Sequence, residues 1–307
     1  MDPHRRPVNP ERRVMLWGLP RSLSTVFLKC ISYVPDIQII NEPYNCAATF
    51  GPQGFSMPSD LNGVDEFGEF MDDVRKEIAK NPEDYKNGWD DENCTFEWVK
   101  RTLEADYPGK KVVFCKDFIF NIMQRLDSIP RGYKHTFLIR DPLKLFLSNR
   151  NLSIDSLPTH IADTFQLDEV SSWPMYPKRG YGELLDLIGY LKDRDLVQSS
   201  PIIIDADDLQ NHPASILSQY CQAVGIPYSD GLLTWEAGDM CVSRNWYISK
   251  SYLAANPMIG FYDNAFDSTK FHSTKDLPKS IPDDVVRLAR QAKPYYQALY
   301  QMRIKPN

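Results

Sequence analysis

The chain of 307 residues lacks the features that mark several common protein classes. It contains no apolar run near the ~18 residues that would cross a membrane, and no internal repeat or low-complexity tract. Its six cysteines, at positions 30, 46, 94, 115, 221 and 241, form no C-x-x-C pair. That pattern argues against a zinc site or a disulfide framework and favours buried thiols in a reducing compartment. We therefore expect a cytoplasmic protein that does not insert into membranes.

A surplus of basic residues is also missing. The 35 Lys and Arg residues are outnumbered by 41 Asp and Glu residues, which gives a formal net charge of −6 and disfavours nucleic-acid binding. Residues 1–12 contain Arg and Pro but no apolar core, so we expect a flexible arm rather than a signal peptide. Because the whole chain is acidic, an anionic ligand needs local positive charge.

Short apolar runs alternate with helical patterns along the rest of the chain. We predict buried strands at 14–18, 112–115, 136–139 and 201–205, and helices at 22–33, 64–80, 95–106, 142–149, 182–196, 213–224 and 281–302. This alternation predicts an α/β fold in which helices cover both faces of a parallel sheet. The length suits a single domain over residues 1–307.

Residues 45–108 form an aromatic-rich insertion between the first two of these strands. Glycine and proline predict a loop over 45–62. Aromatic residues at helical spacing usually fill a core, but such a group near a binding crevice could also wall an acceptor pocket or form a lid. The sequence leaves both alternatives open.

The first predicted strand runs into the turn Leu19-Pro20-Arg21-Ser22-Leu23-Ser24-Thr25, where a helix is expected to start. A strand, a hydroxyl-rich turn and a helix N-terminus together favour binding of a phosphate-like anion. The ATPase pattern G-x-x-x-x-G-K-[ST], laid on Gly18, would require Gly at 23 and Lys at 24. Leu23 and Ser24 stand there instead, and the cation is Arg21.

This turn resembles the 5′-phosphosulfate loop of sulfotransferases that use 3′-phosphoadenosine 5′-phosphosulfate (PAPS), which reads [ST]-x-P-[KR]-S-G-[ST]-[ST]. Leu23 replaces the usual glycine, and the matching positions are Pro20, Arg21, Ser22, Ser24 and Thr25. The chain is most similar to members with Pro-Arg-Ser loops, some of which are named after branched-chain aminotransferases. The resemblance covers most of residues 14–228 and implies a P-loop-like sulfotransferase architecture.

Arg140 and Ser148 are the second part of the resemblance, since the family binds the 3′-phosphate with an Arg at a strand end and a Ser eight residues later. Arginine offers a bidentate fork to phosphate and serine adds a donor. Taken alone, the Arg140-Asp141-Pro142 run also suits a structural helix cap. Ligands of such sheets lie beyond the carboxyl ends of the strands, so Arg21, Lys116 and Arg140 should converge. His135 begins its strand and should lie at the opposite end, in a structural role.

Sulfuryl transfer needs a base for the proton of the acceptor hydroxyl. Family members use a Glu after the first helix or a His after the Lys of the next strand, and here Phe118 occupies the position of that His. The resemblance therefore implies that Glu42 is the base, with Asp117 as the second candidate, and that Lys116 contacts the transferring sulfonate. Alternatively, Glu42 is a turn carboxylate and Lys116 an exposed lysine at a strand end.

The expected function is PAPS-dependent sulfation of a small hydroxylated or phenolic acceptor, releasing 3′,5′-adenosine bisphosphate without a metal. Glu42, Lys116 and Arg21 would be catalytic, and the residues expected to bind the donor are Pro20, Arg21, Ser22, Leu23, Ser24, Thr25, Arg140 and Ser148. A P-loop nucleotide kinase or hydrolase and a non-catalytic nucleotide-binding protein are the alternatives. The oligomeric state is left open, with a homodimer as one alternative.

Overall fold

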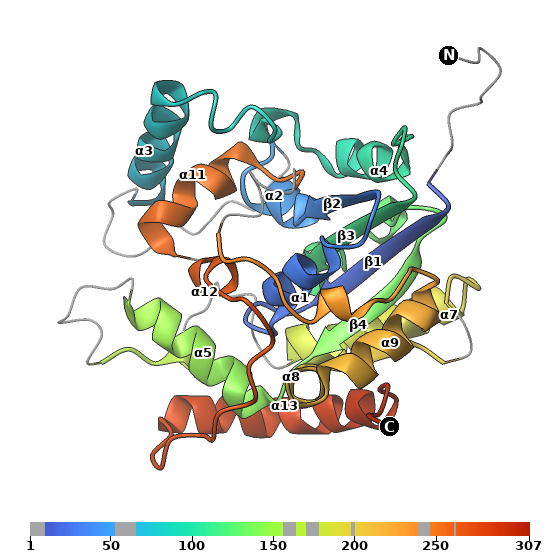
Figure 1. The fold of residues 1–307 in the computed structure, drawn as a ribbon. Coiled ribbons are helices and arrows are strands. Elements are labelled where there is room, and N and C mark those ends of the chain that lie inside the picture. The colour runs from blue at the N-terminus through green and yellow to red at the C-terminus, as the bar shows by residue number, and fades with distance from the viewer. Residues whose placement is uncertain are drawn as a thin grey trace.

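The computed structural model describes residues 10–52, 66–155, 164–169, 178–197, 200–238, 246–260 and 262–307. Five parallel strands form one sheet in the order β2-β3-β1-β4-β5, flanked by helices (Figure 1). The strands are β1 (Arg12–Gly18), β2 (Ile37–Asn41), β3 (Val112–Phe118), β4 (Lys134–Ile139) and β5 (Ile202–Asp205). The predicted α/β fold with a parallel sheet is therefore confirmed.

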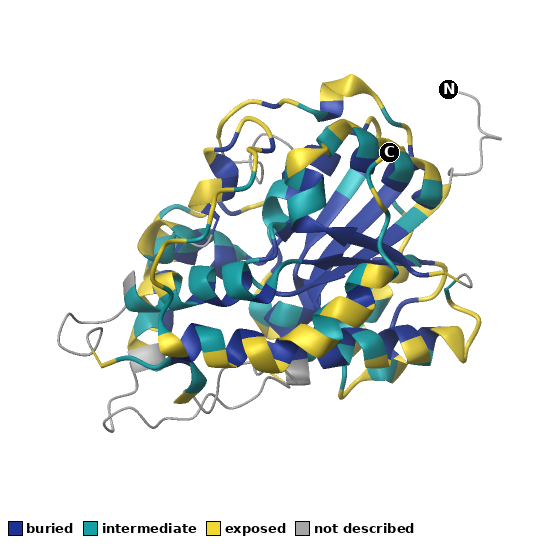
Figure 2. Ribbon diagram, turned by 90° about the horizontal axis from the view of Figure 1, so that it is seen from below, coloured by how far each residue is buried: buried dark blue, intermediate teal, exposed yellow. Residues whose placement is uncertain are grey.

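The sheet is the buried centre of the molecule, and Figure 2 shows its strands almost entirely in the colour of buried residues. β1 lies in the middle and pairs with β3 on one side and β4 on the other. Its residues Val14 to Trp17 are completely buried, because neighbouring strands and helices cover both faces. The loop that follows β1 is consequently flanked by the ends of β3 and β4.

The helices reproduce most of the predicted pattern, with shifted ends. They are α1 (Ser24–Ile31), α2 (Pro43–Thr49), α3 (Glu66–Lys80), α4 (Phe96–Glu104), α5 (Pro142–Asp155), α7 (Glu183–Lys192), α8 (Ala206–Asn211), α9 (Pro213–Val224), α11 (Lys250–Ile259), α12 (Asp263–Phe266) and α13 (Asp283–Gln301). Short 3₁₀ or π turns occupy Asp91–Asn93, Ile119–Asn121, Leu126–Ser128, Leu167–Glu169, Lys178–Gly182 and Asp230–Leu232. None of the helices in these ranges is long and apolar enough to cross a membrane.

Two predictions about the ends of elements are wrong. The strand predicted at 112–115 continues to Phe118, because the charged side chains of Lys116 and Asp117 find buried partners there. The loop predicted at 45–62 begins as helix, since α2 runs to Thr49 and its first N–H groups bond to the Asp117 carboxylate. Residues 53–65 lie outside the described residues. So do residues 1–9 of the expected arm, whereas Arg12 already belongs to β1.

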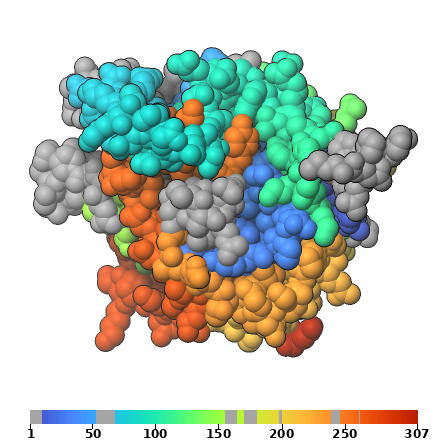
Figure 3. Space-filling model, turned by 45° about the horizontal axis from the view of Figure 1, so that its top comes forward, coloured from blue at the N-terminus to red at the C-terminus, as the bar shows by residue number. Residues whose placement is uncertain are grey.

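The aromatic side chains described in the 45–108 insertion mainly build the core or support neighbouring helices. Phe96 stacks on Tyr44, which in turn stacks on Trp17 of β1. α3 packs on α11, and Figure 3 shows the surface of the insertion beside that of the later segment. A small second core lies between them, made by Met71, Val74, Tyr85, Ala254 and Ala255. Phe55 and the side chain of Phe67 lie outside the described residues.

Candidate functional site

The turn after β1 has an unusual backbone. Arg21 and Leu23 have φ values of 65° and 75°, in the left-handed region that side-chain-bearing residues rarely adopt. Leu23 is the residue before α1 and occupies the glycine position of the 5′-phosphosulfate loop pattern. Its left-handed backbone is one that glycine adopts more easily than leucine. A Cβ on Gly18 would come within 3.2 Å of Ser22 Oγ. Gly18 thus lets the turn fold back tightly over the end of β1.

Arg21, Arg140 and Ser148 come together at this turn. The Nε of Arg21 donates to Ser148 Oγ at 3.1 Å, and Arg140 Nη1 donates to the Arg21 carbonyl oxygen at 2.6 Å. Burial, and secondarily the Arg140 charge, lowers the pKa of Arg21. Arg140 Nε and Ser22 Oγ are buried without a hydrogen-bond partner among the described residues. Paired cations with unused donors favour a bound anion.

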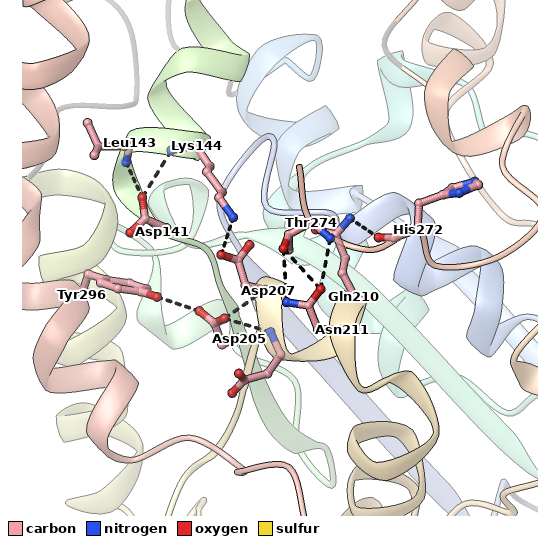
Figure 4. A network of polar contacts seen from close by, with 11 residues as sticks. Asp141, Leu143, Lys144, Asp205, Asp207, Gln210, Asn211, His272, Thr274 and Tyr296 are labelled. Carbon is pink, nitrogen blue, oxygen red and sulfur yellow. Dashed lines mark hydrogen bonds and ion pairs between the residues drawn. The ribbon is translucent and has the colours of Figure 1, made fainter. Parts of the chain in front are cut away.

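Three carboxylates near Arg140, those of Asp141, Asp205 and Asp207, are already engaged in contacts that hold helices in place. Asp141 accepts from the N–H groups of Leu143 and Lys144 and so caps α5, while Lys144 forms an ion pair with Asp207 at 2.7 Å (Figure 4). Asp205 caps α8 and accepts from the Tyr296 hydroxyl, and burial raises the pKa of Asp205 to about 6. No group of metal ligands occurs within the described part of the chain.

Glu42 and Lys116 form a buried ion pair on the other side of the turn. Glu42 follows β2 with a left-handed φ of 58°, and its Oε1 accepts from Lys116 Nζ, which also lies 4.0 Å from the centre of the Phe118 ring. The second oxygen, Oε2, faces the Asn45 amide at 3.1 Å and the Tyr262 hydroxyl at 3.4 Å. The alternative of an exposed Lys116 is therefore wrong, since its side chain is fully buried.

Asp117, the second candidate for the base, is a helix cap. Its carboxylate accepts backbone N–H bonds from Tyr44 at 2.6 Å, Asn45 at 3.1 Å and Phe118 at 2.7 Å. Burial, followed by the Glu42 charge, raises the pKa of Asp117 to about 7. Both oxygens of Asp117 are engaged by backbone N–H groups, as in a side chain that caps a helix.

His135 lies at the opposite, amino end of the sheet. It stacks on Trp17, and its Nδ1 accepts from Trp17 Nε1 at 3.0 Å. Burial lowers the pKa of His135 to about 4, so the imidazole is neutral near pH 7. These contacts agree with the structural role predicted for it. A surface pocket of about 350 Å³ lies at this end, and one of about 490 Å³ lies beside Trp89 and Trp98; neither is lined by the predicted site residues.

Tyr262 belongs to this region, and sequence reasoning missed it. It lies just before the four-residue helix α12, in a segment without a recognisable motif, and reaches Glu42 from 220 positions away. Only the packing of α12 beside α1 brings it to the end of β2 (Figure 1).

Comparisons with known proteins bear on the family. Two Arabidopsis thaliana proteins, branched-chain-amino-acid aminotransferase-like proteins 1 and 2, are each 27% identical to this chain over 290 and 289 residues. The matches cover 92% of this chain but 40% of each relative, so the chain spans about two fifths of the length of these curated relatives.

Solved structures give distant matches. The sulfotransferase domain from the curacin biosynthetic pathway is 14% identical with a TM-score of 0.44, over 92% of this chain and 98% of that one. Sulfotransferase STF9 from Mycobacterium avium is 14% identical with a TM-score of 0.42, over 86% of this chain and 79% of that one. Similarity at this level supports no conclusion about function. Within the chain itself, residues 191–303 match the family model described as a sulfotransferase domain. That match confirms the resemblance of this chain to the sulfotransferase family.

Proposed function

We propose that this protein is a PAPS-dependent sulfotransferase that transfers a sulfonate group to the hydroxyl of a small-molecule acceptor. The observation that carries the proposal is the pairing of two arrangements around one turn. Arg21, Arg140 and Ser148 form a cationic cluster on one side, and Glu42 and Lys116 form a buried acid–base pair on the other. Donor binding and proton removal are the two tasks that sulfuryl transfer requires.

The cationic cluster suits a nucleotide with two anionic ends. The N-terminus of α1 and the hydroxyls of Ser22, Ser24 and Thr25 would hold the 5′-phosphosulfate. Arg140 would use its unpartnered Nε, together with Ser148, on the 3′-phosphate. Pro20 and Leu23 would shape the turn rather than donate bonds, because neither side chain has a polar atom.

The proposed transfer step needs only the donor, the acceptor and side chains of this site. The acceptor oxygen attacks sulfur in line, Glu42 takes the proton of that hydroxyl, and the bond from sulfur to the 5′-phosphate oxygen breaks as 3′,5′-adenosine bisphosphate leaves. Lys116 and Arg21 would stabilise the negative charge that grows on the leaving oxygen, which is an interaction stronger in the transition state than before it. No metal is required for this scheme.

Substitution of Glu42 tests the proposal. We expect Glu42→Gln to lower kcat by about 10²–10⁴ while binding of 3′,5′-adenosine bisphosphate is retained, because the amide cannot accept the proton. The assay follows [³⁵S]-sulfonate transfer from PAPS to 4-nitrophenol, 2-naphthol and 2-phenylethanol. Asp117→Asn is the comparison variant: its amide oxygen can still accept from the Asn45 and Phe118 N–H groups, although the bond from the Tyr44 N–H is lost, and its turnover should fall less than that of Glu42→Gln.

The opposite ranking, with Asp117→Asn inactive and Glu42→Gln active, would assign the base to Asp117. Absence of transfer by the unmodified protein to any acceptor would count against the proposed activity.

A further inference from the structure

We infer that Tyr262 is a positioning residue that holds the Glu42 carboxylate in place when Lys116 engages the transferring sulfonate. This inference rests on the proposed function and extends it to a residue outside every recognised motif. It follows from three features: the contacts of Glu42, the long distance between the Tyr262 hydroxyl and the Glu42 carboxylate, and the contacts that hold the Tyr262 backbone.

The Glu42 carboxylate has one partner that the reaction needs elsewhere. Lys116 bonds to Oε1, and a sulfonate beside Lys116 would compete with Glu42 for its ammonium group. Once Lys116 turns toward the sulfonate, the carboxylate gains the free lone pairs that a base requires. It also loses its strongest positional restraint, because Asn45 and Tyr262 are then its remaining partners among the residues that the structure describes.

Tyr262 is part of a directed chain of polar groups. Asn41 Nδ2 lies 3.4 Å from the Tyr262 hydroxyl oxygen and donates to it, and that hydroxyl donates in turn to Glu42 Oε2 at 3.4 Å. Both distances exceed the roughly 2.7–3.0 Å of well-formed bonds. A small movement of Glu42 away from Lys116 and toward Tyr262 would tighten the second bond. Both contacts are therefore long enough to shorten if Glu42 shifts toward Tyr262.

The backbone around Tyr262 is held firmly, so the carboxylate rather than the tyrosine would move. The Tyr262 N–H donates to Asn256 Oδ1 at 2.8 Å, and its ring packs against Phe266. Lys29 of α1, fully buried, donates to the carbonyl oxygens of Ala265, Phe266 and Ser268 at 3.2, 2.6 and 2.9 Å. Helix α1, which follows the turn at residues 19–25, therefore fixes the segment that carries Tyr262.

Titratable groups of several elements surround Glu42. The tyrosine hydroxyl is the donor that can be removed with little change in shape, since phenylalanine keeps the ring. Within the described residues, the titratable groups that interact with Glu42 are Cys115, Lys116 and Asp117 of β3, Tyr252 of α11 and Tyr262 itself. None of the others changes in a Tyr262→Phe variant, so its pH profile reports the lost hydroxyl.

The experiment compares the unmodified protein with Tyr262→Phe and Tyr133→Phe in the [³⁵S]PAPS assay with the three acceptors named above. Tyr133 is the matched control, because its buried hydroxyl donates to the Leu103 carbonyl at the amino end of the sheet. We expect Tyr262→Phe to lower kcat by about tenfold, the usual scale for a bond to a charged group. The dissociation constant of 3′,5′-adenosine bisphosphate should stay within about twofold, which also shows that the variant is folded.

The pH dependence of kcat separates positioning from a general loss of stability. Removing a donor from a carboxylate disfavours its ionised form, so the acid limb of the profile should move to higher pH in Tyr262→Phe. Tyr133→Phe should keep the original profile. Equal kcat values and profiles for the two variants would overturn the inference while leaving the proposed function intact. Absence of turnover by the unmodified protein would instead contradict the proposed function, and the inference with it.

Discussion

Individual residues at this site adopt conformations that their side chains oppose. Arg21, Leu23 and Glu42 all have left-handed φ values, and all three border the end of the sheet where the polar groups gather. Such conformations cost about 1–2 kcal/mol each and persist where the surroundings enforce them, often at functional sites. The sequence predicted Arg21 and Glu42 through the resemblance, but no residue-level pattern foretold their backbone geometry, because tertiary contacts impose it.

Leu23 allows a direct measurement of this cost. We expect Leu23→Gly to be more stable toward urea than Leu23→Ala by about 1 kcal/mol, because both variants lose the same leucine contacts but only glycine adopts φ near 75° without strain. In a helix interior the order is reversed, with alanine favoured by a similar amount. If Leu23→Ala is the more stable variant, the turn does not hold a left-handed conformation at this position.

At the level of helices, the contact between α1 and α12 connects the turn at residues 19–25, which would bind the donor, to Tyr262 beside the proposed base Glu42. The Lys29 ammonium meets carbonyl oxygens at and just after the C-terminal end of α12, where a cation complements the helix dipole. The helical pattern of α1 was readable from the sequence. The burial of Lys29 on α1 could not be read from the sequence, because lysine normally lies on the exposed side of a helix. The carbonyl partners of Lys29 also lie more than 230 positions away.

Lys29→Met measures the strength of this link. We expect a loss of about 2–4 kcal/mol in the free energy of unfolding, because the carbonyl oxygens stay buried after their shared donor is removed. Lys134→Met is the control, since Lys134 makes a single partly buried bond to the Ala223 carbonyl and should cost less than about 1 kcal/mol. Urea titrations of both variants give the comparison. A smaller loss for Lys29→Met than for Lys134→Met would contradict the link between α1 and α12.

At the scale of the whole molecule, the alternation of apolar runs and helical patterns was enough to predict a parallel sheet, although its edge strand β2 was not among the predicted strands. The meeting of Arg21 and Arg140 at one turn also followed, because the carboxyl ends of parallel strands meet at one edge, whereas Ser148 was identified only through the resemblance. Helix α2 and the position of Tyr262 were harder to foresee. α2 depends on a cap from Asp117 in another strand, and Tyr262 depends on the docking of α12, so neither has a local signal.

The central claim, that the cationic cluster binds a nucleotide through its 3′-phosphate, is tested most directly by calorimetry. The titration compares 3′,5′-adenosine bisphosphate with ADP in the absence of Mg²⁺. We expect the bisphosphate to bind at least about tenfold more tightly than ADP, and Arg140→Ala to remove this preference, because a bidentate bond to phosphate is lost. Equal binding of the two nucleotides, or binding of neither, would contradict the claim and favour a test with ATP and Mg²⁺.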